Sequence, residues 1–280
     1  RDGFRGRIYA TAATTELCGI MLRDCAHIQE ADAEWLNRKR KRAGGEETEP
    51  LYTMQDAEGV LQLFTPCHYG ERVHVAEGIN IRFIDAGHLL GSASIEVFLK
   101  EDGVEKKLVF SGDIGNLNQP LIKNPTYPTT ADYVIMESTY GDRSHGPKPD
   151  YERSLAGIIA ETLSRGGNVV IPCFAVGRTQ EVLYFLRKIR ADGMVPGFEK
   201  VDVWLDSPLA IEATRIFDEQ TRECFDDETL ALMDKRVNPI QFPGLKYSIT
   251  AEDSKRINED PSPKVILSAS GMCDAGRIRH

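Results

Sequence analysis

Two stretches bounded by glycine, Asp85-Ala-Gly-His88-Leu-Leu-Gly-Ser92 and Ser111-Gly-Asp113-Ile-Gly115, decide how this sequence folds and what it does. Each follows an apolar run, so we expect His88 and Asp113 where a β-strand ends. Glycine lets the backbone turn sharply there and leaves room beside the side chains. An imidazole and a carboxylate in this setting suit two ligands of a metal site that activates water.

Taken singly, each residue also fits a structural role. His88 alone is typical of a hydrogen-bonded structural histidine, and Asp113 alone of a turn or cap. A third group, Glu137 in Met136-Glu-Ser-Thr-Tyr-Gly141, follows another apolar strand, although it also suits a carboxylate that caps the following turn. Three such groups at strand ends are what an open zinc or manganese site needs, and together they favour a metal site.

Composition sets the broad class of the protein. The 280 residues leave room for two domains, and 43 acidic against 34 basic residues give a net charge of −9. This charge does not indicate nucleic-acid binding overall, although a local basic groove remains compatible with it. Six scattered cysteines without a CxxC pair predict reduced thiols in a cytoplasmic protein. No apolar run is long enough for a membrane span, so no membrane partner is expected.

The first half is predicted to be rich in hairpins. We expect strands at 8–11, 79–84, 94–99 and 107–110, with Glu101-Asp-Gly103 turning the last two into a hairpin. Helices are expected at about 15–42, capped by Thr14 or Thr15, and at 53–64. The basic run Arg38-Lys-Arg-Lys-Arg42 is interpreted as a solvated helix end, with an RNA-backbone contact as the alternative.

The second half alternates strands with helices. Apolar runs at 133–137, 168–172, 201–205 and 264–268 are typical of buried parallel strands. The change of pattern near 140–149 predicts two domains, residues 1–142 and 143–280. Two intervening helices are expected to bury one apolar face each, made of Leu155, Ile158, Ile159 and Leu163 in the first and Val182, Phe185, Leu186 and Ile189 in the second.

Loops after these strands carry candidates for binding phosphate. In Ser268-Ala-Ser270-Gly271-Met, backbone N–H groups and hydroxyls precede an expected helix that contains Arg277, which is a suitable context for an anion. A plain N-cap explains Ser270 equally well. Arg178 follows a glycine at another helix start, where a guanidinium can bind phosphate.

Two of these positions have structural alternatives. An ion pair with Glu181 or Glu137 is the alternative for Arg178. For Asp206-Ser207-Pro208, at the end of another strand, helix capping is the leading interpretation.

These motifs together resemble the metallo-β-lactamase superfamily and, within it, the β-CASP nucleases. His88 resembles the third metal motif of the family, Asp113 the fourth, and Glu137 the acidic motif A. Further blocks resemble the family along most of the chain: Pro172-Cys-Phe-Ala-Val-Gly-Arg178-Thr-Gln-Glu181, Leu205-Asp-Ser-Pro-Leu209 and Ser268-Ala-Ser-Gly-Met-Cys-Asp-Ala-Gly-Arg277.

The resemblance implies an α/β fold with a partial metallo-β-lactamase αββα sandwich in residues 1–142 and a parallel-sheet β-CASP α/β domain in residues 143–280. The HxHxDH motif of the family is absent and is expected upstream of Arg1, and the motif B and motif C histidines are expected beyond His280. The chain is therefore expected to be the central fragment of a longer enzyme.

The resemblance also implies a zinc-dependent ribonuclease that cleaves single-stranded RNA with metal-activated water, endonucleolytically. Of two zinc ions, His88 would bind one and Asp113 would bridge both. Glu137 would orient the motif B histidine, and its Glu-Ser-Thr-Tyr-Gly block resembles the RNA-processing branch. The residues implied to bind substrate are Arg178, Ser268, Ser270, Gly271 and Arg277.

Two alternatives remain at this stage, a small-molecule hydrolase of the same fold and a non-catalytic RNA-binding scaffold. A homodimer is a further expectation from the family. The isolated chain is expected to bind zinc weakly and to lack nuclease activity, because two ligands are too few to hold a catalytic pair of ions.

Overall fold

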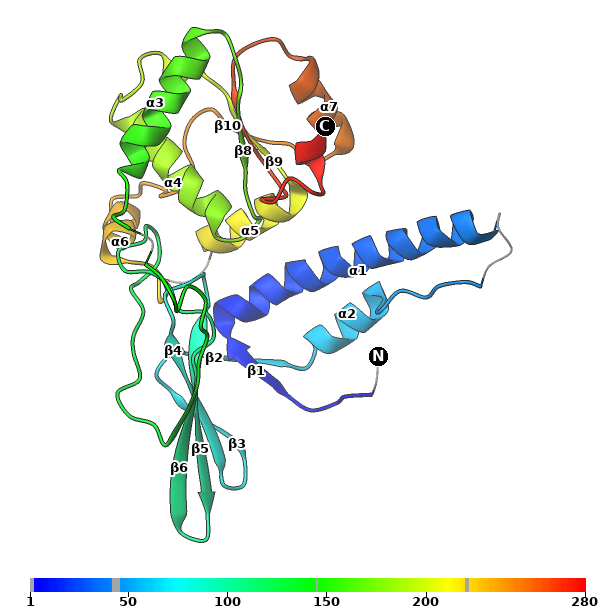
Figure 1. Ribbon diagram of the computed structural model, residues 1–280, viewed down its shortest axis with the longest axis vertical. Helices are drawn as coiled ribbons and strands as arrows, with labels where there is room; N and C mark the ends of the chain where they lie inside the picture. The colour runs from blue at the N-terminus through cyan, green and yellow to red at the C-terminus, as the bar shows by residue number, and fades with distance from the viewer. Residues whose placement is uncertain (1–2, 42–45, 145, 220–221) are drawn as a thin grey trace.

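The computed structural model describes residues 3–41, 46–144, 146–219 and 222–280. Arg1 and Arg42, named above, lie outside these ranges. Helices and strands are mixed along the chain, which confirms the α/β class. Figure 1 shows a five-stranded sheet at one end of the molecule and a four-stranded sheet flanked by helices at the other.

The N-terminal segment forms a small parallel pair of strands and a long helix. Strand β1 (Ile8–Thr11) pairs with β2 (Phe64–Cys67), and helices α1 (Ala12–Lys41) and α2 (Met54–Leu61) lie between them in the chain. The expected cap of α1 is wrong: the Thr14 amide donates to Thr11 Oγ1 at 3.2 Å, so the helix begins three residues early. The second helix is shorter than expected because Phe64 begins a strand.

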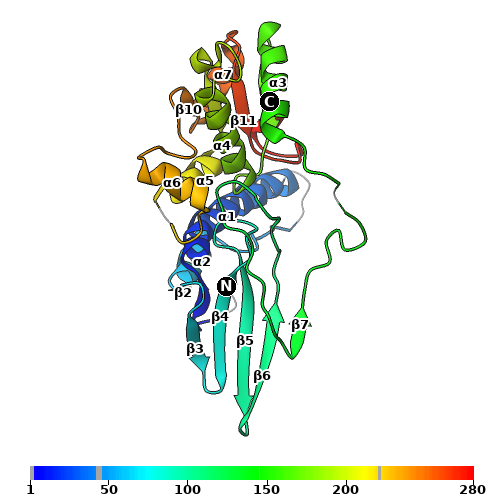
Figure 2. The ribbon, with the colours of Figure 1, turned by 90° about the vertical axis from the view of Figure 1, so that its left-hand side faces the viewer.

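The five-stranded sheet has the order β3-β4-β5-β6-β7, antiparallel except for the parallel pair β6–β7. The predicted hairpin is confirmed: Asp102 and Gly103 both have positive φ, as a tight two-residue turn requires. Figure 2 shows this sheet face on. Its strands are β3 (Arg72–Ala76), β4 (Ile79–Asp85), β5 (Ala93–Glu101), β6 (Val104–Phe110) and β7 (Tyr133–Ile135).

The four-stranded sheet is parallel throughout, as predicted, with the order β10-β9-β11-β8. Figure 1 shows α3 and α4 on one side of it and α7 on the other. The strands are β8 (Val169–Pro172), β9 (Val203–Asp206), β10 (Leu245–Tyr247) and β11 (Val265–Ser268). The helices are α3 (Tyr151–Ser164), α4 (Arg178–Ala191), α5 (Pro208–Glu219), α6 (Asp227–Asp234) and α7 (Ala251–Glu259), with 3₁₀ turns at Phe198–Lys200 and Arg277–Arg279.

The apolar face of α3 differs from the predicted one at a single residue. Ile159 is fully buried, but Ile158 is 54% exposed and Ala156 is buried instead. Successive helix residues are separated by about 100°, which turns Ile158 away from the side occupied by Ala156, Ile159 and Leu163. The spacing of three residues from Leu155 therefore assigned Ile158 to the wrong side of α3.

One apolar core continues from the N-terminal elements into the parallel-sheet region. Leu17 on α1 and Ile122 belong to the same buried cluster as Leu183 and Leu267. Ile122 also forms an isolated β-bridge with Phe225. Apolar packing thus joins α1 and the loop at 121–122 to the parallel-sheet region, while the domain boundary after residue 142 stays a prediction.

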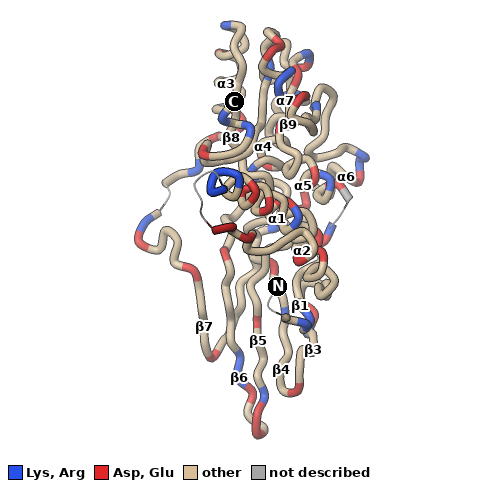
Figure 3. Tube along the Cα trace, turned by 90° about the vertical axis from the view of Figure 1, so that its right-hand side faces the viewer, with Lys and Arg blue, Asp and Glu red and all other residues tan. Residues whose placement is uncertain are grey.

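Side chains at the basic end of α1 contact neighbouring residues of the same N-terminal region. Lys39 Nζ lies 5.4 Å from the Trp35 ring centre, and the Arg40 guanidinium contacts the Thr48 hydroxyl. Figure 3 shows this blue helix end beside a short acidic segment. These contacts suit a basic helix end stabilised by the helix dipole. Within the described ranges, no helix is both long and apolar enough to cross a membrane.

The loops that follow β4 and β6 cross backbone to backbone. The Gly115 amide donates to the Ala86 carbonyl at 2.8 Å. A Cβ atom on Gly115 would lie 1.6 Å from the Gly87 carbonyl oxygen, so no side chain fits there. This crossing brings the segments that carry His88 and Asp113 into contact.

A buried carboxylate joins the three central antiparallel strands. Glu96 on β5 is fully buried; its Oε2 lies 2.5 Å from Arg82 Nε on β4, and Lys107 on β6 contacts Oε1. Burial raises the pKa of Glu96, but hydrogen bonds from Arg82 and Lys107 outweigh it, so the net pKa lies below its ordinary value. Glu96 is therefore charged when the sheet is folded.

Replacing Gly115 by alanine is expected to lower the free energy of unfolding by at least roughly 3 kcal/mol, because the two backbones would have to separate. Urea denaturation of the chain measures this change. The matched control is Gly157→Ala on α3, where a Cβ meets no atom within 4 Å. That change is expected to stabilise the helix by up to about 1 kcal/mol. Equal stability of the Gly115 variant and wild type would contradict the crossing.

Replacing Glu96 by glutamine is expected to cost roughly 3–5 kcal/mol near neutral pH, because it leaves two cations without their buried partner. Because the pKa of Glu96 is lower in the folded chain, this stabilisation is fully present at pH values above the unfolded-state pKa of about 4.3. It is lost as the pH falls through the folded-state pKa. The difference between wild type and variant, measured by urea denaturation, should therefore shrink below about pH 4. Glu105→Gln, at a half-exposed pair with Arg72, should cost less than about 1 kcal/mol; an equal cost for both variants would refute the assignment.

Candidate active site

The His88 loop is held by one serine hydroxyl. Ser92 Oγ accepts hydrogen bonds from the His88 and Leu89 amides at 3.0 and 3.1 Å. The Gly87 amide donates to Asp85 Oδ1 at 2.8 Å, which closes the turn after β4. Local hydrogen bonds of serine and aspartate side chains thus fix the backbone of the loop, in which the His88 side chain is half-buried.

The Asp113 loop begins at the end of β6. Ser111 is tied to β7 through its amide, which donates to the Ile135 carbonyl at 2.9 Å. Gly112 has φ +58°, a conformation that favours glycine, and its missing Cβ would lie 3.0 Å from the Ala93 carbonyl. Asp113 follows at an exposed position.

Glu137 joins the same cluster from the far end of β7. Its amide donates to Ser111 Oγ at 2.9 Å, and its Oε1 accepts from the Ile114 amide at 2.6 Å. The Ile114 hydrogen bond, one from the Thr139 side chain and the nearby His88 imidazole hold the pKa of Glu137 below its ordinary value. The carboxylate is thus ionised and lies near His88 and the Asp113 loop, in a half-exposed position rather than a buried one.

The side chains at this site have donor atoms of the kinds that bind a metal, but too few of them lie close together. An imidazole nitrogen and a carboxylate oxygen are both donors that zinc accepts. Across the part of the chain that the structure describes, however, no group of three or more His, Cys, Asp or Glu side chains lies close enough to hold a metal ion. His88, Asp113 and Glu137 therefore do not make a complete metal centre by themselves, although their loops are in contact.

The Ser268 loop differs from its expected form. Ser268 is buried, and its hydroxyl lies 3.3 Å from the Asp206 carbonyl. The Ser270 hydroxyl donates to Asp274 Oδ1 at 2.8 Å. The helix expected after this loop is only the 3₁₀ turn Arg277–Arg279, because Gly276 adopts φ +76°, outside the helical region.

Arg277 is engaged inside the protein. Its Nη1 donates to Asp206 Oδ1 at 2.8 Å and to the Ser248 carbonyl at 2.9 Å, and its Nη2 donates to the Ile249 carbonyl at 2.7 Å. These bonds use the donors that would otherwise bind phosphate. In this conformation Arg277 holds the loop rather than facing a substrate.

Asp206 is a structural centre that the sequence did not reveal. Besides Arg277, its carboxylate accepts from the hydroxyls of Ser248 at 2.7 Å and Ser254 at 2.8 Å. The helix capping expected within Asp206-Ser207-Pro208 is confirmed at Ser207, whose hydroxyl accepts from the Ala210 amide at 3.3 Å. The only sequence signal that could have singled out Asp206 is that this residue ends a buried parallel strand.

Arg178 forms one of the two ion pairs considered for it. Its guanidinium contacts Glu181 on the next turn of α4, and the Arg178 side chain remains 60% exposed. Burial raises the pKa of Glu181, opposed by Arg178 and Lys148. Burial also raises the pKa of the neighbouring Cys173 thiol to about 11, which makes it a poor nucleophile.

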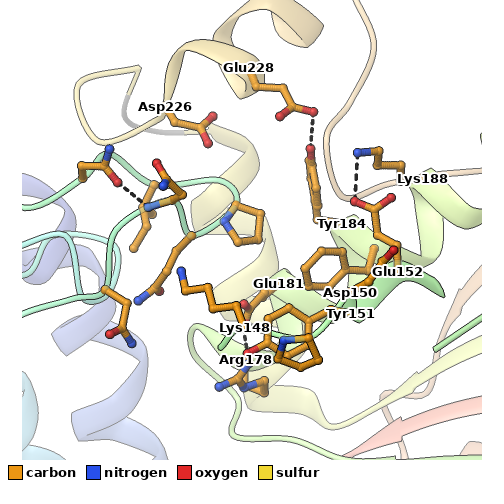
Figure 4. A pocket seen from close by; sticks show the side chains of 18 of the residues that line it. Lys148, Asp150, Tyr151, Glu152, Arg178, Glu181, Tyr184, Lys188, Asp226 and Glu228 are labelled. Carbon is orange, nitrogen blue, oxygen red and sulfur yellow. Dashed lines mark hydrogen bonds and ion pairs between the residues drawn. The ribbon is translucent and has the colours of Figure 1, made fainter. Parts of the chain in front are cut away.

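Two cavities meet at Arg178. The polar cavity, of about 620 Å³, lies between the loop at 116–124 and the starts of α3, α4 and α6. Figure 4 shows the Tyr184 hydroxyl bonded to Glu228 and Lys188 paired with Glu152 on its walls. A second, more apolar cavity of about 560 Å³ shares Arg178 with it and reaches His88.

Comparisons with known proteins agree with this arrangement. Residues 179–280 match the family model described as the Beta-Casp domain. The chain is 36% identical over its full length to Ribonuclease TTHA0252 of Thermus thermophilus, of which it covers 58%. It is 28% identical to Endoribonuclease YSH1 of Saccharomyces cerevisiae over its full length, covering 34% of that protein.

A third relative is the Transcription termination factor FttA of Methanosarcina mazei. It is 31% identical over 99% of the chain, which covers 41% of that protein. The chain thus spans between about a third and three fifths of the length of these relatives. Residues 179–280 thus match the Beta-Casp domain, and over its whole length the chain is similar to these relatives.

Proposed function

We propose that the whole protein is a metal-dependent ribonuclease that hydrolyses phosphodiester bonds of single-stranded RNA, with endonucleolytic cleavage favoured. The observation that carries the proposal is the contact between the His88 and Asp113 loops, with an ionised Glu137 beside them and a cavity that leads from His88 to Arg178. The names of two relatives, a ribonuclease and an endoribonuclease, support it.

His88 and Asp113 are the residues that would hold the metal, which we propose to be zinc. When bound, zinc supplies Lewis-acid activation of water near neutral pH. Asp113 is exposed at the loop crossing, so its carboxylate is accessible to a bound substrate and metal. Glu137 is already fixed by the Ile114 amide and is placed to orient an imidazole, which sets the tautomer and basicity of that ring.

Substrate contacts are proposed along the two joined cavities. Arg178 has an exposed guanidinium at their junction and can bind a backbone phosphate there. In the Ser268 loop, Ser270 and Gly271 line neither cavity and are half-buried, whereas Ser268 is buried. Arg277 supports that loop from inside through Asp206. A homodimer and a cytoplasmic location stay predictions.

In the whole protein, Asp113→Ala is expected to reduce the cleavage rate of a labelled single-stranded RNA by more than about 100-fold. Changes in groups that only support a metal ligand already cost about 10–100-fold, which is the loss expected for Glu137→Gln. Asp113 is exposed, so thermal unfolding should be unchanged and serves as the control for folding. Unchanged cleavage by the Asp113 variant would remove this mechanism, whereas RNA binding without cleavage by wild type would favour a non-catalytic RNA-binding role.

The 280-residue chain by itself is expected to bind less than stoichiometric zinc and not to cleave RNA, because His88 and Asp113 supply too few ligands for a closed site. Elemental analysis after dialysis, together with incubation with the same labelled RNA, tests both points. Stoichiometric zinc with robust cleavage would show that the described residues already hold a complete centre.

A further inference from the structure

The apolar cavity beside His88 has three exposed apolar side chains on its walls. Leu89 follows His88, Phe174 lies in the loop after β8, and Met21 comes from α1. Their exposed fractions are 38%, 55% and 46%, so each presents a substantial apolar surface. Large apolar side chains exposed together in a cavity commonly mark a place where a ligand binds.

Two glycines fix the apolar walls. Gly177 adopts φ +85°, and a Cβ there would lie 2.3 Å from Leu89 Cδ2, so only glycine leaves room for this leucine. A Cβ on Gly271 would lie 3.0 Å from Phe174 Cδ2. The Phe174 ring therefore packs with one edge against the Gly271 backbone. These close contacts restrict both side chains before any ligand arrives.

The backbone of Phe174 is fixed as well. Its carbonyl accepts a hydrogen bond from the Thr179 hydroxyl at 2.7 Å, and Thr179 is almost fully buried. The neighbouring Cys173 amide donates to the Ser268 carbonyl at 3.0 Å. An aromatic ring that is immobilised and still half exposed loses little entropy when a flat ligand stacks on it.

The lining of the cavity also includes charged and metal-binding groups. His88, a proposed metal ligand, and Arg178, a proposed phosphate contact, line it together with the apolar side chains. A nucleotide unit has a matching combination of properties: a charged phosphate on each side and a flat apolar base between. Stacking on an aromatic ring accepts any base, because every base has a π-face.

We propose that this cavity binds one nucleobase of the RNA substrate, stacked on Phe174 and enclosed by Leu89 and Met21, next to the phosphate that is cleaved. This inference rests on the proposed ribonuclease function and adds to it the residues that position a base. It makes Phe174 a substrate-binding residue of the loop after β8.

The test is a cycle of protein and RNA changes in the whole protein. Binding of a labelled single-stranded RNA is measured by fluorescence anisotropy with a chelator present, so that cleavage does not interfere. A series of RNAs each lacks one base. One abasic position is expected to weaken binding to wild type by about 5- to 140-fold, the range found for loss of a base–aromatic stack. With Phe174→Leu, removing that same base should cause no further loss.

Two control variants distinguish loss of base stacking from loss of folding and from loss of any exposed aromatic ring. Phe174→Tyr keeps the ring and should bind like wild type, and its thermal unfolding reports on folding. Trp35→Leu removes a ring that is 54% exposed on α1 and does not line the cavity, so it should leave the abasic series unchanged.

Two outcomes would overturn the proposal, and they can be told apart. If wild type binds RNA but Phe174→Leu keeps the full sensitivity to every abasic position, base stacking on Phe174 is wrong while the ribonuclease proposal stands. If wild type binds no single-stranded RNA, the proposed function fails and this inference fails with it. Equal binding of single-stranded DNA would leave the base contact intact and contradict the choice of RNA.

Discussion

The constraint on which the site depends is a backbone contact that tolerates no side chain. Gly115 and the Ala86–Gly87 segment cross so closely that a Cβ would reach 1.6 Å from a carbonyl oxygen. Because the crossing links the ends of β4 and β6, it sets the distance between the His88 and Asp113 loops without any side-chain contact. Glu137 then joins through the Ile114 amide, one residue before Gly115. The catalytic geometry proposed here is therefore a consequence of backbone packing.

The parallel-sheet half uses the opposite solution, a buried charged side chain. Asp206 holds two hydroxyls and the Arg277 guanidinium, so β9, the start of α7 and the Ser268 loop meet at one carboxylate. A buried carboxylate is costly unless its oxygens are satisfied, and here three donors satisfy them. A backbone crossing limits only the distance between two loops, whereas the hydrogen bonds of a buried carboxylate also limit the orientation of the groups that donate to it. The Ser268 loop is accordingly held by Arg277 from within.

The sequence predicted what depends on local pattern and missed what depends on distant partners. The parallel strands, the hairpin at Asp102 and the strand-end positions of His88 and Asp113 followed from apolar runs and glycines. The Asp206 network could not be foreseen because Ser254 and Arg277 lie 48 and 71 residues away along the chain. The cap at Thr11 was missed for a different reason: Thr11, Thr14 and Thr15 are all of a residue type that caps helices, and the local pattern does not choose among them.

The two halves also share the cavity beside His88, and this links base binding to the fold. Leu89 belongs to the His88 loop, whereas Gly177, against which it packs, begins α4 of the parallel-sheet half. Phe174 is likewise positioned by Thr179 on α4 and by Gly271 after β11. A shift of one sheet against the other would open the Leu89–Gly177 contact and change the width of the cavity. Leu90, which follows Leu89, belongs to the same buried core cluster as Leu183 of α4, so apolar packing opposes such a shift. The same packing therefore keeps the two walls of the proposed base-binding cavity together.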